Sequence, residues 1–211
     1  LEKPERIYLN LGGDFFNTDC NGKTTTKGTP QDEESTIPDT TRRATWMVIT
    51  AIKALANYAP VTLVIIPGNH DEVRSWFFGH AMEMYFYSDD RVTVDNREIF
   101  RKYYRYGINL IGAVHGEEDR KKLPFLMVQE NLKDYGETLV RYIFSGHLHT
   151  KKGEAKIVDE DRGVSIWTNP SLSGSDKWHN KTGLIGSIKE AQCWVFDKTM
   201  GHTETIVCQF F

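Results

Sequence analysis

The chain of 211 residues is 39% hydrophobic and 26% charged, and its formal net charge is −3. This composition is typical of a globular domain and gives no global attraction to nucleic acid, and no apolar run approaches the roughly 20 residues that span a bilayer. The N-terminus lacks the apolar core of a signal peptide, and Cys20, Cys193 and Cys208 are too far apart to suggest cysteine-bound zinc, so we expect a reduced, cytoplasmic protein with no membrane partner.

The first 40 residues predict one strand and one long loop. Residues 7–11 form a short apolar run that leads directly into Gly13 and Asp14. Residues 17–40 are rich in Thr, Gly, Asp and Pro and contain almost nothing to bury. We expect this segment to form a loop on the surface.

A helix is predicted over 42–57, with Thr40 or Thr41 as its N-cap. Its polar residues form only a narrow stripe, while Trp46 and other apolar side chains fill the remainder. Such a helix should be mostly buried against a sheet.

Three later segments are continuous apolar runs with β-branched residues, the pattern of central strands covered on both faces. They are residues 61–66, 108–114 and 139–144. Between the first and second runs we expect an aromatic-rich helix over 72–87 and one or two strands within 91–105.

From about residue 154 the pattern changes to short strands separated by turns. The expected strands are 154–158, 163–168, 192–197 and 203–210. A hairpin turn at 198–201 would join the last two. These elements predict an α/β fold, a layered sandwich of two mixed β-sheets flanked by helices. We expect a single domain over 1–211, with a small insertion at about 72–107.

Polar residues follow the central strands at the point where each strand ends. They are Asp14 after the first strand, Asn69 and His70 after the second, His115 after the third, and His147 and His149 after the fourth. Ligands of α/β sheets bind beyond the carboxyl ends of the strands, so one edge should collect these side chains. A neighbouring glycine at each position lets the backbone turn sharply.

Carboxylate, amide oxygen and imidazole groups suit divalent ions, with Mn²⁺ as the first expectation and Fe, Zn, Ni or Mg as alternatives. A carboxylate such as Asp14 can bridge two ions about 3.5–4 Å apart, the spacing used in two-metal hydrolysis. Such a pair activates water and neutralises phosphoryl charge. Each motif alone is also explained by an ordinary strand-to-loop turn, but the ordered set predicts a metal site.

The ordered set resembles the motifs of the calcineurin-like metallophosphoesterase superfamily over residues 13–149. The matching motifs are Gly13-Asp14, Gly68-Asn69-His70-Asp71, His115-Gly116 and Gly146-His147-Leu148-His149. The resemblance implies that Asp14 bridges two metals, that Asn69, His115 and His147 bind one of them, and that His149 binds the other. It also implies that His70 contacts the phosphate and protonates the leaving group, and that Asp71 orients His70.

The superfamily's first motif, Asp-x-His, does not occur in these 211 residues. In the family it completes the metal site to which His149 would belong, so the second site is incomplete as the sequence is written. We expect a truncated, split or incompletely represented chain. Asp176 and His179 could in principle supply substitute ligands, although an ordinary polar surface loop is the simpler explanation of both.

The sequence therefore predicts a metal-dependent phosphoesterase, more narrowly a phosphodiesterase and DNA nuclease. Asn17, three residues after Asp14, is a candidate substrate contact. Basic clusters at 97–105 and 120–122 lie near aromatic residues that could stack bases. Solvated surface and a core beneath a capping insertion explain the same residues. The alternative function is a catalytically impaired binding or scaffold module of the same fold; the oligomeric state is not predicted.

Overall fold

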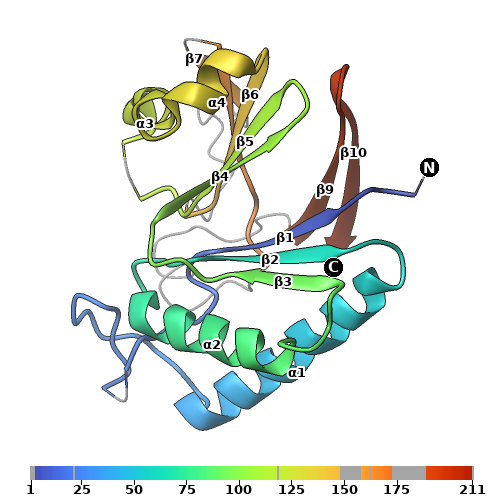
Figure 1. Ribbon diagram of the computed structural model, residues 1–211. Coiled ribbons are helices and arrows are strands. Elements are labelled where there is room, and N and C mark those ends of the chain that lie inside the picture. Colours follow the sequence, from blue (N-terminus) through green and yellow to red (C-terminus); the bar gives the residue numbers. More distant parts are fainter. Residues whose placement is uncertain are drawn as a thin grey trace. The chain divides into compact units, whose positions relative to one another are not determined.

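The computed structural model describes residues 3–20, 22–117, 119–147, 158–161, 163–172 and 189–210. The chain divides into two compact units, Leu1–Phe100 and Arg101–Phe211, which can be followed by colour in Figure 1. Each unit has its own sheet and its own hydrophobic core, and the predicted α/β class is confirmed. None of the described helices combines the length and the apolar character needed to cross a membrane.

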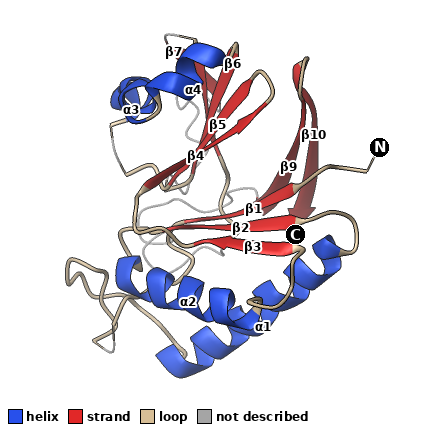
Figure 2. Cartoon of the chain, in the orientation of Figure 1, coloured by secondary structure: helices blue, strands red, loops and turns tan. Residues whose placement is uncertain are grey.

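The first unit is a parallel sheet of order β1-β2-β3, and Figure 2 shows both of its helices on one face of that sheet. Its elements are β1 (Ile7–Gly12), α1 (Ile37–Ala56), β2 (Val61–Ile66), α2 (Glu72–Tyr85) and β3 (Val92–Asp95). β1 and β2 pair in register from Ile7–Val61 to Gly12–Ile66. Their carboxyl ends therefore lie side by side, and so do the loops that follow them.

The expected continuous strand at 61–66 is present, and every residue of β2 is buried. β3 pairs with β2 in parallel and completes the sheet of the first unit, and α2 connects these two strands. β4 (Arg101–Tyr106) opens the sheet of the second unit. A single domain with an insertion at about 72–107 stays a prediction.

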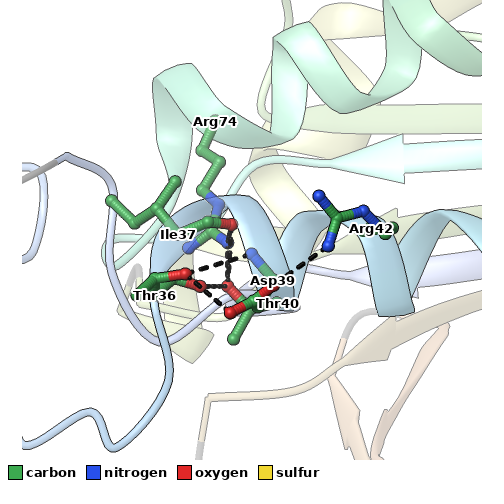
Figure 3. Close-up of polar contacts among 6 residues, drawn as sticks. All are labelled: Thr36, Ile37, Asp39, Thr40, Arg42 and Arg74. Atoms are coloured by element: carbon green, nitrogen blue, oxygen red, sulfur yellow. Dashed lines mark hydrogen bonds and ion pairs between the residues drawn. The ribbon is translucent and has the colours of Figure 1, made fainter.

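Helix α1 begins earlier than predicted, and its N-cap is Thr36 (Figure 3). Thr36 has extended backbone angles, φ −82° and ψ 154°, and its Oγ1 accepts the backbone N–H of Asp39 at 3.3 Å. The prediction of Thr40 or Thr41 as the cap is wrong. The Thr40 hydroxyl donates back to the carbonyls of Thr36 and Ile37, as a threonine inside a helix does.

The prediction that this helix is mostly buried is also wrong. Its buried residues, Val48, Ile49, Ile52 and Ala56, all lie on the face that covers the sheet. Trp46 is 60% exposed. The apolar content of α1 therefore exceeds what the sheet can cover from one side.

The second unit contains a five-stranded mixed sheet of order β4-β5-β6-β8-β7 and a separate β9-β10 hairpin. The strands after β4 are β5 (Asn109–Val114), β6 (Val140–Ser145), β7 (Val158–Asp161), β8 (Val164–Thr168), β9 (Lys189–Asp197) and β10 (Gly201–Phe210). β5, β6 and β8 run parallel, while β4 and β7 are antiparallel to their neighbours. The described strands thus form three sheets, of which this one is mixed.

The two faces of the five-stranded sheet are covered differently. The segment between β5 and β6 forms the 3-10 turn η1 (Arg120–Lys122), α3 (Leu123–Glu130) and α4 (Leu132–Glu137). Leu123 and Met127 join Ile143 in the core on one side. On the other side the hairpin adds aromatic rings, with Phe144 and Trp194 centred 4.3 Å apart.

The N-cap of α1 gives a first prediction. Replacing Thr36 by Ala removes the acceptor for the Asp39 amide and should lower the free energy of unfolding by about 1 kcal/mol. Thr50→Ala is the matched control, because the Thr50 hydroxyl only bonds back to the carbonyl of Trp46 at 2.7 Å inside the same helix. Urea unfolding followed by circular dichroism measures both. Equal losses for the two variants would contradict Thr36 as the cap.

Candidate metal centre

Asp14 lies in a tight turn at the end of β1, where Gly13 and Asp14 have φ values of 82° and 51°. Left-handed backbone is rare for a residue with a side chain and is often found at functional sites. The Asp14 Oδ1 accepts the backbone N–H of His70, which follows β2, at 2.9 Å. This bond fixes the direction of the carboxylate.

Gly68 is required by the closeness of these two loops. A Cβ atom at this position would lie 2.2 Å from both the backbone nitrogen and the Oδ1 of Asp14. No side chain fits at such a distance. The glycine of the Gly-Asn-His-Asp motif therefore allows the β1 and β2 loops to touch.

Asp71 is fully buried and holds the same two loops together. Its Oδ1 accepts the backbone N–H groups of Asp14 at 3.2 Å and Gly68 at 3.0 Å, and its Oδ2 accepts that of Phe16 at 2.9 Å. Burial raises the pKa of the Asp71 carboxyl, and the nearby Asp14 charge acts in the same direction, while the amide hydrogen bonds oppose the shift.

His70 is oriented by the main chain of Asn17. The ring Nδ1 of His70 lies 3.2 Å from the Asn17 carbonyl oxygen. A carbonyl only accepts, so Nδ1 carries the hydrogen and Nε2 is the nitrogen that remains for a substrate oxygen. The prediction that the Asp71 carboxylate pairs with the His70 ring is wrong, because both Asp71 oxygens accept backbone amides. Asn17 is exposed, and its side chain donates to the Asp32 carbonyl at 3.2 Å.

The long loop after Asp14 is tied to α2 by residues that no sequence pattern distinguishes. Asp19 Oδ1 accepts the Arg74 backbone N–H at 2.7 Å. The buried Arg74 guanidinium donates to the Thr18 carbonyl at 3.0 Å and lies 4.0 Å from the ring centre of Phe16. Burial lowers the Arg74 pKa, and Glu33, Asp71 and Asp19 oppose this shift. These contacts join positions more than 50 residues apart, so no local pattern reveals them.

In the second unit, His115 and His147 follow the neighbouring parallel strands β5 and β6. His115 Nε2 and His147 Nδ1 lie 3.0 Å apart, with the ring planes at 77° to each other. His115 is buried, and His147 has a left-handed φ of 63°. The two imidazoles therefore direct one nitrogen each towards the same point.

This spacing fits a shared divalent ion. With metal–nitrogen distances of about 2.0–2.1 Å, two ligand nitrogens at right angles around an ion stand about 3.0 Å apart. Without an ion, one ring must donate its N–H to the other. The donor type and the separation of the pair thus match those of two neighbouring metal ligands.

Asn169 lies in the same row of strand ends. Its N–H donates to the Ser145 carbonyl at 2.7 Å, just as the Gly146 N–H donates to the His115 carbonyl at 2.8 Å. The Asn169 Oδ1 is buried and accepts no hydrogen bond within the described part of the chain. Its only signal in the sequence is its position directly after a strand.

The structure thus brings the predicted site residues together in two groups. The first unit groups Asp14, Asn69, His70 and Asp71, and the second groups His115 and His147. His149, Asp176 and His179 lie outside the described residues.

Comparison with known proteins identifies the family. The model of the calcineurin-like phosphoesterase family matches residues 1–151. A Vps29 double mutant from Entamoeba histolytica is 12% identical, with a TM-score of 0.39, and the match covers 77% of this chain and 89% of that one. A Vps29 single mutant from the same organism, also 12% identical, has a TM-score of 0.36 over 98% and 99% of the two chains. No curated protein matches. From the match over residues 1–151, the chain belongs to the calcineurin-like phosphoesterase family.

Proposed function

We propose that this chain hydrolyses phosphodiesters with metal-activated water. The observation that carries the proposal is the 3.0 Å approach of His115 Nε2 and His147 Nδ1. By the family's pattern, Asp14 and Asn69 would be further ligands, and His149 would hold a second ion. When bound, divalent ions lower the pKa of water and neutralise charge on the phosphoryl oxygens. Family membership supports divalent metal binding, and Mn²⁺ is the first ion to test.

His70 is the residue proposed to handle the proton of the leaving group. The Asn17 carbonyl accepts from Nδ1–H, so Nε2 is the ring nitrogen that remains for a substrate oxygen. An imidazolium at this position can donate its Nε2 proton to the departing oxygen. Asp71 would act indirectly, because its carboxylate accepts the backbone amides of Asp14 in the β1 loop and of Gly68 in the loop that carries His70.

The pairing of the basic residues favours a diester over a monoester. Arg97 lies 2.8 Å from Asp95 and Arg101 lies 2.5 Å from Glu130, while Arg105 is paired with Glu137. A phosphomonoester carries up to two negative charges at neutral pH, whereas a diester carries one. With these arginines neutralised by the protein's own carboxylates, the singly charged ester is the better match.

DNA is the narrower substrate hypothesis, and the contacts of the basic cluster at 97–105 argue against it. Nonspecific DNA binding depends on cations that are available to phosphates. Within the cluster at 97–105, Arg97, Arg101 and Arg105 are engaged in ion pairs, and Lys102 is completely buried. The aromatic Tyr103 donates its hydroxyl to Glu130 at 2.9 Å. These contacts favour a small diester over a long polyanion.

A binding module without catalysis is the second candidate. It is favoured by exposed apolar residues on α2, among them Phe77 and Met84. Bound metal and turnover separate the two candidates, since a module has no need of either.

The metal ligands give a second prediction. Purified protein with Mn²⁺ should hydrolyse bis-p-nitrophenyl phosphate faster than p-nitrophenyl phosphate, with single-stranded DNA as a third substrate. Replacing His115 and His147 by Ala should remove bound metal, measured by elemental analysis, and diester turnover together. The matched control is His80→Ala, an exposed histidine of α2. A metal-loaded chain that turns over none of the three substrates would contradict the proposal.

The role of His70 gives a third prediction. His70→Ala should keep its metal and lower kcat by about 10²–10⁴-fold for a dinucleotide, whose alcohol leaving group needs a proton. The loss should be much smaller for bis-p-nitrophenyl phosphate, because p-nitrophenolate leaves without protonation. Parallel kinetics on the two substrates measure the difference. An equal loss on both would argue against proton donation by His70.

The contact at Gly68 gives a fourth prediction. Gly68→Ala places a methyl group against the Asp14 backbone and should displace the Asp14 carboxylate. We expect weaker Mn²⁺ binding in calorimetric titration and a loss of stability of about 1–3 kcal/mol. Gly136→Ala is the control, because nothing lies within 4 Å of the added atom. Normal metal affinity in Gly68→Ala would show that this close approach does not set the Asp14 position.

A further inference from the structure

The Arg74 side chain, in the first turn of α2, contacts the residues on both sides of Asn17. Its Nη1 donates to the Thr18 carbonyl at 3.0 Å and to the Thr18 hydroxyl at 3.3 Å. Its guanidinium carbon lies 4.0 Å from the centre of the Phe16 ring. Asn17 stands between these two contacts, and its carbonyl oxygen is the acceptor that lies 3.2 Å from His70 Nδ1. One guanidinium therefore fixes the chain before and after the group that orients the His70 ring.

The other nitrogen of the guanidinium is anchored to the start of α1. Figure 3 shows Arg74 reaching Ile37 and Thr40, and Nη2 donates to the Ile37 carbonyl at 3.2 Å and to the Thr40 hydroxyl. The Thr41 hydroxyl accepts from the same nitrogen at 3.0 Å. The Arg74 residue is only 6% exposed. A planar guanidinium with several acceptors and an aromatic ring against it is held in one conformation, which a flexible ammonium cannot reproduce.

Asn17 has little of its own to fix its carbonyl. The residue is exposed, and its side chain donates to the Asp32 carbonyl at 3.2 Å. The peptide bond is planar, so the direction of the Asn17 carbonyl depends on the backbone angles of Asn17 and Thr18. Thr18 is completely buried, and Arg74 bonds its carbonyl. The acceptor of His70 thus depends on the neighbour that Arg74 contacts.

We propose that Arg74 is a positioning residue for His70, which acts through the Asn17 carbonyl to keep hydrogen on Nδ1 and to leave Nε2 for the substrate oxygen. The hydrogen bond made by one ring nitrogen sets the state of the other. This inference rests on the proposed role of His70 as proton donor, although the position of the ring hydrogen can be measured without any turnover.

The proton balance of the step depends on this arrangement. The bond between phosphorus and the leaving oxygen breaks, and that oxygen takes the proton from Nε2 of the His70 imidazolium. The neutral ring that remains carries its hydrogen on Nδ1, which is the form that the Asn17 carbonyl stabilises. Without Arg74 the carbonyl can turn away, and the ring can rotate or carry its hydrogen on Nε2. Only a reaction that needs the His70 proton should then suffer.

Nitrogen NMR of the His70 ring tests the proposal and gives the fifth prediction. In the full chain without added metal, at a pH where the ring is neutral, the ¹⁵N shifts should place the hydrogen on Nδ1. Arg74→Met removes the guanidinium, and a large fraction of the Nε2–H form should appear. Arg74→Lys is the milder variant and should shift the ring in the same direction. A His70→Ala spectrum assigns the signals, and circular dichroism checks that each variant is folded.

Arg141 provides a matched control in the second unit. Its guanidinium carbon lies 3.8 Å from the centre of the Tyr135 ring, and its Nη2 donates to the carbonyls of Tyr135 and Thr138, both at 2.6 Å. Arg141→Met therefore removes the same kinds of contact at a place that does not touch Asn17. The His70 ring should keep its hydrogen on Nδ1 in this variant.

Kinetics with Mn²⁺ give an independent readout. Arg74→Met should lower kcat by on the order of 10²-fold for a dinucleotide, because a misplaced proton donor loses its alignment with the leaving oxygen. The loss should be much smaller for bis-p-nitrophenyl phosphate, whose leaving group needs no proton. A general loss of structure would lower both rates together, and Arg141→Met should show no difference between the two substrates.

The outcomes separate this proposal from the proposed hydrolysis. An Nδ1–H form that persists in folded Arg74→Met and Arg74→Lys would overturn the positioning role, and so would an equal shift in Arg141→Met. Equal kinetic losses on the two substrates in Arg74→Met would also overturn it. A chain that turns over no substrate, but whose His70 ring shifts in Arg74→Met, would refute the hydrolysis and support the positioning of the ring by Arg74.

Discussion

The Asp71 carboxylate is buried, and a buried carboxylate must find hydrogen-bond donors inside the protein. The donors it finds are the main-chain amides of Asp14, Phe16 and Gly68, which belong to the two loops that follow β1 and β2. The position of the Asp14 side chain and the path of the His70 backbone both follow from this requirement. In the first unit, the geometry at the strand ends is therefore set by the main chain around one acidic side chain.

The second unit positions its two histidines by a different route. Val114 is paired with Ser145 in the parallel register of β5 and β6, and His115 and His147 come one and two residues after these paired positions. No buried acid is needed to hold them. The left-handed backbone of His147 supplies the turn that swings its ring towards His115. A regular strand continuation would have sent this side chain elsewhere.

The sequence was sufficient where the signal is local. Continuous apolar runs located β2, β5 and β6, and polar residues at their ends indicated the residues of the candidate site. It was insufficient where contacts are distant or patterns are short. Ile37 and Pro38 look like loop residues, although proline is well suited to a first helical turn, so the start of α1 was missed. Helix α3 is short and mostly apolar, with no clear periodicity, and it was not predicted.

The role of Asp71 shows the same limit within the site. Its place beside His70 in the motif suggested a side-chain pair, whereas its actual partners include Asp14 and Phe16, more than 50 residues away. Short sequence distance and spatial contact are different properties. A motif identifies residues that act together, but it does not show which of their atoms face one another.

The first turn of α2 also depends on the loop between β1 and α1. Asp19 accepts the amides of Val73 and Arg74, and the Thr26 hydroxyl accepts that of Glu72. Because the acceptors of these amides belong to the loop, the first turn of α2 loses them when the loop moves away from the helix. Loop and helix start should therefore open as one cooperative unit, and hydrogen exchange at these amides would report the motion of a segment that does not contain them.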